Sequence, residues 1–566
     1  MQSLTRTALS ALFIFSLISL PLHAQIGSAI PYENGVVASA DKHASAAGLE
    51  MLKRGGNAVD AAIAVQFALA VTSPHKGNIG GGGFMVLHLA DGTVRTLDFR
   101  EKAPARAERD MFLDESGEYI PERSRVGGLA SGVPGTVDGM INALERHGTL
   151  PLEVIMQPAI DLATGGFPLS HEMARILNSR VDELSRFEET KEIFVRRDGR
   201  PWRAGDRLTQ RELAETLERI ARQGRDGFYS GVTARLIVQE MSRTGGIITL
   251  RDLRNYQSEW RDPLTASYKG YNLYMMPPPS SGGLVVQQIL GMIGEVDTSN
   301  VGFNSAEYVH LVAESMRRSF ADRNYYLGDP DFVDIPMEQL ADEAYLRSRM
   351  QNFNPIEATP SDSVSHGEFL TAGETDETTH FSVIDRNGNA VAITTTINGW
   401  FGSFVTVSGA GFLMNNEMDD FSAKPGAPNM FGLIGAEANA VEPDKRMLSS
   451  MTPMIAAKDG QVRFIGGGAG GPRIITATLQ NFLNIAVFGM NVQQSIEALR
   501  FHHQWLPDRL YVEPFFPSDT KALLQSKGHN VTKMSFIGRT YNIYVDDEGK
   551  RFGAADPRGD GQVEGY

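Results

Sequence analysis

The sequence predicts an α/β protein in which helices cover a sheet. Two buried-helix patterns occupy residues 41–74, and two strand-like runs follow at residues 84–89 and 94–99. Apolar helices mixed with short hairpin strands are typical of helices packed on a sheet. Hydrophobic residues make up 42% of the 566-residue chain and charged residues 21%, so we expect a packed core and no extensive disorder.

The N-terminus has the pattern of a secretory signal peptide. Arg6 precedes a 15-residue apolar run at residues 8–22, and Ala24 offers a small residue before a cleavage point at Gln25. A membrane-spanning helix needs about 20 residues, so an uncleaved anchor is the weaker alternative. We expect residues 1–24 to be removed and the mature protein to be periplasmic or secreted, with no membrane attachment.

The first elements after this leader are two helices and a hairpin. The apolar spacing over residues 44–52 predicts a helix, and Asn57 is placed to cap a second one over residues 58–71. The second helix is apolar nearly all round, which predicts a buried core helix. The run at residues 84–89 then pairs with residues 94–99 across an Asp-Gly turn.

Helical patterns dominate residues 150–243, and a strand-like run at residues 271–276 precedes a helix that begins near Leu284. The composition then changes at residues 354–377, which hold few apolar and many Ser, Thr, Glu and Asp residues. Such a stretch buries little surface, so we expect an exposed, flexible segment. An interdomain linker is the more common use of this composition.

A core hairpin begins abruptly at Thr378, where the chain becomes β-branched and aromatic with the alternation of a half-buried strand. Asn387-Gly388 is a strong signal for a two-residue hairpin turn. In that register Thr378 lies opposite Ile397, with Thr396 and Asn398 beside it. The polar segment therefore ends at a threonine that opens a core strand, with polar residues gathered around it.

Several functional classes are not expected from the composition. The chain contains no cysteine, which removes thiolate catalysis, disulfides and cysteine metal sites. It carries 53 Lys and Arg against 68 Asp and Glu, whereas nucleic-acid-binding proteins usually present a basic face. There is no H-E-x-x-H, P-loop or G-x-S-x-G motif. We expect no cofactor, no metal and no nucleic-acid partner.

A series of segments from Gly35 to Tyr566 covers nearly the whole mature chain: GGNAVDAAIAV, IGGGGFMVLH, LDFREKAPARA, MPPPSSGG, ADRNYYLGDPDFVD, TTHFSVID, NNEMDDFSAKPG, KRMLSSMTP, RIITATLQ, RFHHQWLPD and ADPRGDG. Together they resemble γ-glutamyltranspeptidases, which are N-terminal-nucleophile hydrolases. Their common order makes coincidence a poor explanation. The resemblance implies a four-layer αββα sandwich, formed jointly by two subunits cut from one precursor.

The resemblance implies autocatalytic cleavage between Glu377 and Thr378, giving a large subunit, 25–377, and a small catalytic subunit, 378–566, that form a heterodimer. The freed α-amine of Thr378 titrates at about 7.7–8.0 and lies next to the hydroxyl, so it can serve as the base. Thr378 would attack the γ-carbonyl of glutathione or another γ-glutamyl compound. Water, or an acceptor amino acid or dipeptide, would then resolve the ester.

The remaining site residues are also implied by the resemblance. Thr396 matches the hydroxyl that hydrogen-bonds the nucleophile, and Gly470 and Gly471 match the oxyanion donors. A γ-glutamyl group presents both an α-carboxylate and an α-ammonium, so its recognition needs both signs of charge. The matching residues are Arg100, Ser449 and Ser450 for the carboxylate and Asn398, Glu417 and Asp420 for the ammonium.

Two loops depart from the family pattern. Phe431 falls in the lid-like loop 425–436 where Tyr is frequent, so any hydrogen bond from that hydroxyl is absent. The loop 466–471 has Gly468 and Ala469, followed by Pro472, where Ser, Pro and Ser are often found. It also fits G-x-G-x-x-G, but the sequence about 20 positions on lacks the strand-end acid of a dinucleotide site. An anion-binding nest is the preferred interpretation.

Other functions remain open. A related N-terminal-nucleophile amidase, such as a cephalosporin or glutaryl acylase, would recognise an acyl group without an α-ammonium. Arg100, Asn398, Glu417 and Asp420 together favour glutamyl over that alternative. A non-catalytic periplasmic binding protein could keep the fold, and failure to self-cleave would favour it. A metal-dependent hydrolase is the weakest alternative, since the sequence shows no ligand cluster.

Overall fold

The computed structural model describes residues 29–297, 301–366, 378–424, 426, 427, 429, 430, 433 and 435–566. The predicted signal peptide 1–24, Glu377 and the lid residue Phe431 lie outside the described residues. Among the described residues, no helix combines the length and the apolar character that crossing a membrane requires.

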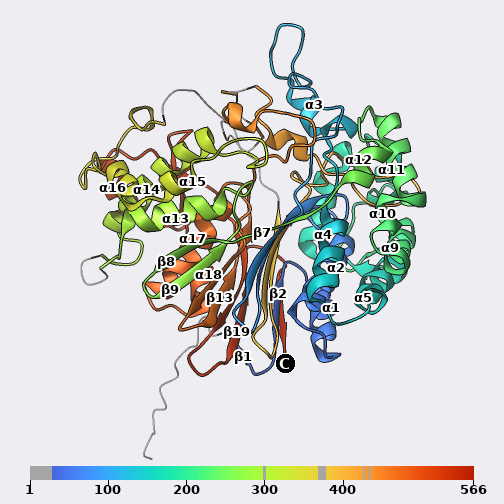
Figure 1. Cartoon of the computed structure of the whole chain (residues 1–566), viewed down its shortest axis with the longest axis horizontal. Helices are drawn as coiled ribbons and strands as arrows, with labels where there is room; N and C mark the ends of the chain where they lie inside the picture. The colour runs from blue at the N-terminus through green and yellow to red at the C-terminus, as the bar shows by residue number, and fades with distance from the viewer. Residues whose placement is uncertain are drawn as a thin grey trace, which may run out of the picture.

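Two antiparallel sheets stack face to face at the centre of the molecule (Figure 1). The first follows the order β20 (Gln562–Gly565), β2 (Val36–Ser39), β10 (Thr379–Ile384), β11 (Ala390–Thr396), β3 (Gly82–His88), β4 (Val94–Asp98) and β7 (Glu259–Arg261). The second follows β1 (Pro31–Tyr32), β19 (Arg551–Ala555), β18 (Arg539–Val545), β13 (Gln461–Gly466), β12 (Met454–Lys458), β9 (Tyr271–Met275) and β8 (Leu264–Tyr268), with β14 (Gly468–Ala469) on β18. Each sheet takes strands from both sides of Thr378.

Helices cover both outer faces of the sheet pair (Figure 1). Against the first sheet lie α1 (Lys42–Lys53), α2 (Ala58–Thr72), α4 (Thr136–His147), α5 (Leu152–Gly165), α9 (Arg211–Gln223), α10 (Asp226–Tyr229), α11 (Gly231–Thr244) and α12 (Leu250–Asn255). Against the second lie α13 (Gly282–Ile293), α14 (Ala306–Tyr326), α15 (Met337–Ala341), α16 (Glu343–Arg349), α17 (Arg473–Ala486) and α18 (Val492–Glu497). The predicted αββα sandwich is confirmed.

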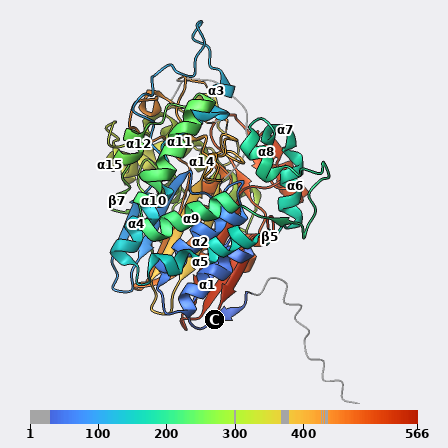
Figure 2. The same cartoon turned by 90° about the vertical axis from the view of Figure 1, so that its right-hand side faces the viewer.

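The smaller elements lie outside these four layers. They are α3 (Pro121–Arg125), α6 (His171–Ser179), α7 (Val181–Leu184), α8 (Glu188–Phe194), α19 (Ser518–Ser526), β5 (Phe167–Pro168), β6 (Arg207–Leu208), β15 (Phe501–His502), β16 (Leu510–Val512) and β17 (Val531–Lys533). In the view of Figure 2, α6, α7 and α8 stand out to one side of the main helical layer.

The buried helix α2 forms as the sequence predicts. The side chain of Asn57 accepts hydrogen bonds from Val59 N and Asp60 N, and the Asp60 carboxylate accepts one from Asn57 N, which completes a capping box. Every residue of α2 is buried, and the helix contacts β10, α1 and α5. An apolar surface all round is stable here because neighbours cover every side.

The predicted register of the 378–397 hairpin was wrong by one residue. Ile384 pairs with Ala390, so Thr379 lies opposite Thr395 and the same register places Thr378 beside Thr396. The turn has three residues, Arg386–Gly388, in place of the two predicted.

The side chain of Asp385 explains this longer turn. Its carboxylate accepts hydrogen bonds from Asn387 N at 2.8 Å and from Asn389 N at 3.1 Å. Gly388 then takes a φ of +91°, the left-handed conformation that closes three-residue hairpin loops. The same carboxylate caps α2 through Ala58 N at 3.1 Å, so a contact distant in sequence stabilises the turn.

Residues 354–366 are held against both halves of the chain. Asn354 O hydrogen-bonds His310 Nε2 at 2.8 Å, and Ser361 Oγ donates to Trp505 O at 2.6 Å. Ser361 N donates to Asp508 Oδ2 at 2.8 Å. These contacts connect parts of 354–366 to the rest of the fold, while 367–377, the remainder of the segment predicted to be flexible, lie outside the described residues.

Candidate active site

Most of the sequence-predicted site residues line one cavity, whereas Gly470 is not among its lining residues. Strands β4 and β11 end, and β10 begins, at the same edge of the first sheet, because neighbouring strands in it run antiparallel. This edge brings together residues that are far apart in the chain. Those lining the cavity are Arg100, Thr378, Thr396, Asn398, Glu417, Asp420, Ser449, Ser450 and Gly471.

The two threonines at this edge are almost fully buried, Thr378 at 5% exposure and Thr396 at 3%. Asn398 N donates to Thr396 Oγ1 at 2.7 Å, and Asn78 Nδ2 donates to Thr396 O at 2.9 Å. The position of Thr396 is therefore fixed at both its hydroxyl and its carbonyl.

The glycine-rich loop approaches the cavity from the second sheet. Gly470 has a φ of +136° and Gly471 of +54°, so both lie in the region that favours glycine. Gly471 lines the cavity and precedes α17, whose positive N-terminal end favours a negative charge. Gly468 and Ala469, where the chain departs from the family pattern, pair with Thr540 and Arg539 as β14, so strand pairing holds the loop in place.

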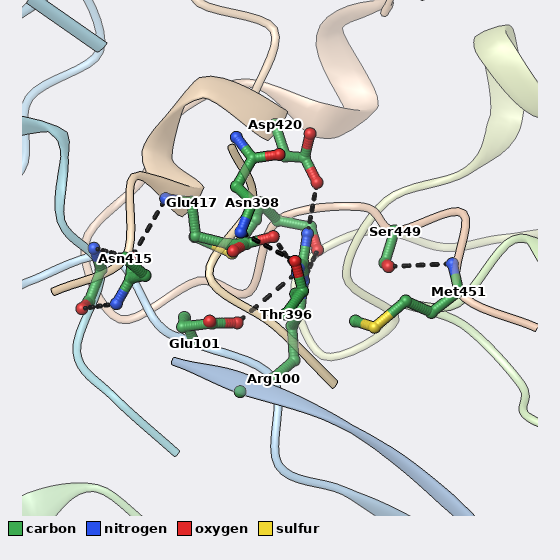
Figure 3. Close-up of polar contacts among 12 residues, drawn as sticks. Arg100, Glu101, Thr396, Asn398, Asn415, Glu417, Asp420, Ser449 and Met451 are labelled. Carbon is green, nitrogen blue, oxygen red and sulfur yellow. Dashed lines mark hydrogen bonds and ion pairs between the residues drawn. The ribbon is translucent and has the colours of Figure 1, made fainter. Parts of the chain in front are cut away.

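Arg100 is the central charge of the cavity (Figure 3). Its guanidinium is fully buried and donates through Nη1 to Glu417 Oε1 and through Nη2 to Asp420 Oδ2 at 2.5 Å. Nε donates to Met447 O at 3.2 Å, and Glu101 Oε2 lies 3.5 Å from Nη1. Three carboxylates thus surround one arginine.

Burial changes the protonation of these carboxyl groups. Burial raises the pKa of Glu101 to about 7 and that of Asp420 to about 6, although attraction to Arg100 opposes both shifts. Burial likewise raises the pKa of Glu417 well above its ordinary value. Burial alone would lower the pKa of Arg100, but Glu417, Glu101 and Asp420 together raise it, so the arginine stays charged.

Two carboxylate oxygens of this cluster are unpaired. In the described part of the chain, Glu417 Oε2 and Glu101 Oε1 are buried and have no hydrogen-bond partner. A buried acceptor without a donor is costly, and a bound cation that brings N–H donors relieves that cost. The cluster is therefore suited to an ammonium group.

Ser449 and Ser450 line the cavity directly after Met447 and Leu448, whose carbonyls accept hydrogen bonds from Arg100. Ser449 O accepts hydrogen bonds from Ser281 N and Ser281 Oγ, each at 2.7 Å. Ser449 Oγ accepts from Met451 N at 3.2 Å (Figure 3). The Pro-rich segment before α13 thereby fixes the serine loop.

Arg323 is a site residue that sequence reasoning missed. It lines the cavity near the end of α14 and donates to Ser281 Oγ at 2.9 Å, Asn324 Oδ1 at 2.9 Å and Ser450 Oγ at 3.1 Å. Burial lowers its pKa to about 10, so it remains charged at neutral pH. Its segment, ADRNYYLGDPDFVD, contributed to the family resemblance, but helix periodicity gave no reason to place it at the site.

The predicted lid is described only in part. Ala427, Asn429, Leu433 and Gly435 line the cavity, and Met430 N donates to Asp419 Oδ2 at 2.9 Å. These parts of the loop 425–436 therefore lie over the site.

Within the described ranges, one group of side chains has the spacing of metal ligands: His310, Glu314 and His529. None of them lines the cavity. Glu314 already binds Arg317 at 3.2 Å and Arg318 at 2.7 Å, which makes the group a salt-bridged cluster.

Comparison with known proteins identifies the family. The family profile described as Gamma-glutamyltranspeptidase matches residues 44–566. The chain belongs to the γ-glutamyltranspeptidase family. The glutathione hydrolase proenzyme of Escherichia coli K12 is 47% identical over 536 residues, which cover 94% of this chain and 92% of that protein.

Two solved structures support the fold. The cephalosporin acylase from Bacillus halodurans has a TM-score of 0.85 at 28% identity, covering 98% of this chain and 99% of that one. The Helicobacter pylori γ-glutamyltranspeptidase has a TM-score of 0.57 at 43% identity, covering 58% of this chain and 94% of that one. The chain is thus an N-terminal-nucleophile enzyme with γ-glutamyl transferase and hydrolase activity, as the sequence predicts.

Proposed function

We propose that the chain cleaves itself before Thr378 and then uses Thr378 as the nucleophile of γ-glutamyl transfer from glutathione and other γ-glutamyl compounds. The observation that carries the proposal is the convergence of Thr378, Thr396, Gly471 and the Arg100 cluster on one cavity. Glycine N–H groups for an oxyanion and charges of both signs for an amino acid then lie around one hydroxyl.

Self-cleavage needs no outside reagent except water. Thr378 Oγ attacks the carbonyl carbon of Glu377, the C–N bond breaks, and the nitrogen takes the proton, so an ester replaces the peptide bond. Water then hydrolyses the ester and leaves a carboxylate on Glu377 and a free α-amine on Thr378. The large subunit, 25–377, and the small subunit, 378–566, stay together because each sheet contains strands of both.

Transfer follows the same path with a new acyl group. The α-amine of Thr378 takes the hydroxyl proton as Oγ attacks the γ-carbonyl. The N–H groups of Gly470 and Gly471 stabilise the oxyanion, and the departing amine receives the proton. Water, an amino acid or a dipeptide then resolves the γ-glutamyl ester and restores Thr378.

The Arg100 cluster would recognise the amino-acid end of the substrate. The α-carboxylate pairs with Arg100 and the hydroxyls of Ser449 and Ser450, because a guanidinium fork matches a carboxylate. The α-ammonium is received by Asn398, Glu417 and Asp420. An acylase substrate without an ammonium would bring no N–H donor to the buried Glu417 Oε2, which favours γ-glutamyl donors over that alternative.

We propose that the enzyme is exported. The apolar run at residues 8–22, followed by Ala24, supports removal of residues 1–24 and a periplasmic or secreted enzyme.

The deciding experiment is intact mass and N-terminal sequencing of the purified mature protein under denaturing conditions, with glutamate release from glutathione measured in parallel. Two chains, the smaller beginning Thr378-Thr379-His380, are expected. Thr378→Ala should stay uncut and inactive, whereas Thr378→Ser, which keeps a hydroxyl, should cleave. A wild-type chain that remains uncut yet active would refute the mechanism, because its Thr378 would have no free α-amine.

A further inference from the structure

A second hollow, of about 730 Å³, adjoins the active-site cavity and is rich in arginine. We call it the arginine groove. The lining residues on which the argument depends are Arg125, Arg175, Arg180, Arg186, Arg539 and Trp400. Such a gathering of cations is unexpected in a chain with a net charge of −15.

The groove borders elements on two sides of the Thr378 cavity. Gly399 and Trp400 line the groove directly after Asn398, which lines the cavity. Asn398 Nδ2 also donates to Asn416 O at 3.0 Å, and Asn416 lines the groove. The two hollows therefore share a wall.

The other border is the glycine-rich loop. Arg539 lines the groove and pairs with Ala469 across β14 and β18. Its neighbour Gly538 is so close to Gly470 that an added Cβ on Gly470 would lie 3.0 Å from Gly538 Cα. The groove thus adjoins the proposed oxyanion donors, where the amine half of a γ-glutamyl amide would lie.

Four of the five arginines of the groove form ion pairs. Arg125 binds Asp419 at 3.2 Å, Arg180 binds Glu183 at 2.8 Å and Arg539 binds Glu172 at 2.8 Å. Arg186 binds Glu122.

Arg175, on α6, is exposed and has no ion-pair partner among the described residues. A guanidinium carries five N–H donors, so Arg180, whose Nη1 binds Glu183, also keeps donors for a second anion.

Arg175 and Arg180 flank one rim of the groove. The Arg180 guanidinium lies over the Trp400 ring, 5.4 Å from its centroid, which orients the cation by a cation–π contact. Arg175 is exposed and Arg180 is half-buried, so this part of the groove is reachable from solvent.

We propose that the arginine groove binds the carboxylate of the amine half of the substrate: the peptide that leaves the γ-glutamyl group or accepts it. This inference rests on the proposed function. The leaving amine and the attacking amine occupy the same position in forward and reverse transfer, so one groove serves both. Arginine suits the task because its planar fork binds a carboxylate through two parallel hydrogen bonds. Peptides with a free C-terminal carboxylate are thus preferred over amines that lack one.

The test compares three donors: glutathione, its C-terminal amide, and γ-glutamyl-p-nitroanilide, whose leaving group has no carboxylate. For each, kcat/KM is measured on enzyme that mass spectrometry shows to be cleaved. In the double variant Arg175→Gln/Arg180→Gln, the ratio of kcat/KM for glutathione to kcat/KM for the anilide should fall about tenfold. This is the effect expected from the loss of one charge-assisted hydrogen bond. In the wild type, glutathione amide should be poorer than glutathione by a similar factor.

Matched variants make the test specific. Arg235→Gln removes an exposed arginine of α11 that does not line the groove, so the glutathione-to-anilide ratio should match the wild type. Arg175→Lys alone should lower the glutathione-to-anilide ratio less than Arg175→Gln alone does, because the positive charge remains. An unchanged ratio in the double variant, including one in which kcat/KM falls equally for both donors, would overturn the inference. Wild-type enzyme that is cleaved but converts none of the three donors would refute the proposed function itself.

Discussion

The backbone N–H of Asn398 donates a 2.7 Å hydrogen bond to the side-chain hydroxyl of Thr396. A hydroxyl that accepts one hydrogen bond still has its own proton to donate. The register of β10 and β11 places Thr378 beside Thr396. The Asn398–Thr396 bond therefore fixes a hydroxyl next to the proposed nucleophile.

We accordingly expect Thr396→Ala to lower kcat for γ-glutamyl-p-nitroanilide by about tenfold to a hundredfold, since one hydrogen bond is worth about 1–3 kcal/mol. Thr396→Ser keeps the hydroxyl and should retain most of the activity. Both variants are compared after complete cleavage has been verified by mass. Equal activity in Thr396→Ala and Thr396→Ser would exclude a role for the hydroxyl.

The carboxylates around Arg100 should make the stability of the unliganded protein depend on pH. The pKa of Glu101 rises from an ordinary 4.5 to about 7 and that of Asp420 from 3.8 to about 6. Between the ordinary and the raised pKa values, the folded state holds these protons more tightly than the unfolded chain does. The two protonated acids therefore stabilise the fold most below pH 4, and this contribution is lost as the pH rises through 6–7. Glu417→Gln removes the third carboxyl group of the cluster, so the thermal midpoint of the variant should fall less steeply as the pH rises. A steeper fall in the variant would contradict the assignment.

Ligand binding should release protons from the same cluster. An α-ammonium is attracted to ionised Glu417 and Asp420, so a bound amino acid lowers their pKa values. L-glutamate should therefore bind more tightly as pH rises from about 5 to 8. Calorimetric titrations in two buffers of different ionisation enthalpy measure the released protons, and Glu417→Gln should release fewer. Net proton uptake would be incompatible with an ammonium at this position.

Arg323 should act as a positioning residue for the serine loop. It has no ion-pair partner among the described residues and donates to Ser450 Oγ and Ser281 Oγ. Arg323→Gln should raise KM for γ-glutamyl-p-nitroanilide by about tenfold with a smaller change in kcat, because ground-state binding of the carboxylate end is weakened. Arg323→Lys keeps the positive charge but not the planar guanidinium, so its KM should lie between those of the wild type and of Arg323→Gln. A loss confined to kcat would argue against this role.

Asp385 should matter for stability and not for chemistry. Its carboxylate is 2% exposed and accepts bonds from the backbone N–H groups of Ala58, Asn387 and Asn389. Asp385→Ala leaves these donors unpaired and should destabilise the fold by about 2–4 kcal/mol. Asp385→Asn retains one acceptor oxygen and should cost less. The readout is the thermal midpoint of the cleaved enzyme, and an unchanged midpoint in Asp385→Ala would contradict the expectation.

Local sequence signals determined several of the helices and strands, and the family resemblance indicated most of the proposed site. The cap at Asn57 and the apolar run after it define α2, because helix ends and periodicity depend on neighbours along the chain. The strand that opens at Thr378 was evident for the same reason. The hairpin register was missed, since the turn depends on Asp385, whose carboxylate also reaches the start of α2.

Only the tertiary structure decided how charges are shared at the site. The sequence indicated Arg100, Glu417 and Asp420, but not that the two acids bind the arginine before a substrate does. It gave no reason to bring Arg323 to Ser450, or to join Arg125, Arg175 and Arg539 in one groove. Side chains from positions hundreds of residues apart meet because the two sheets and their helices pack as one core, and no local pattern encodes those distances.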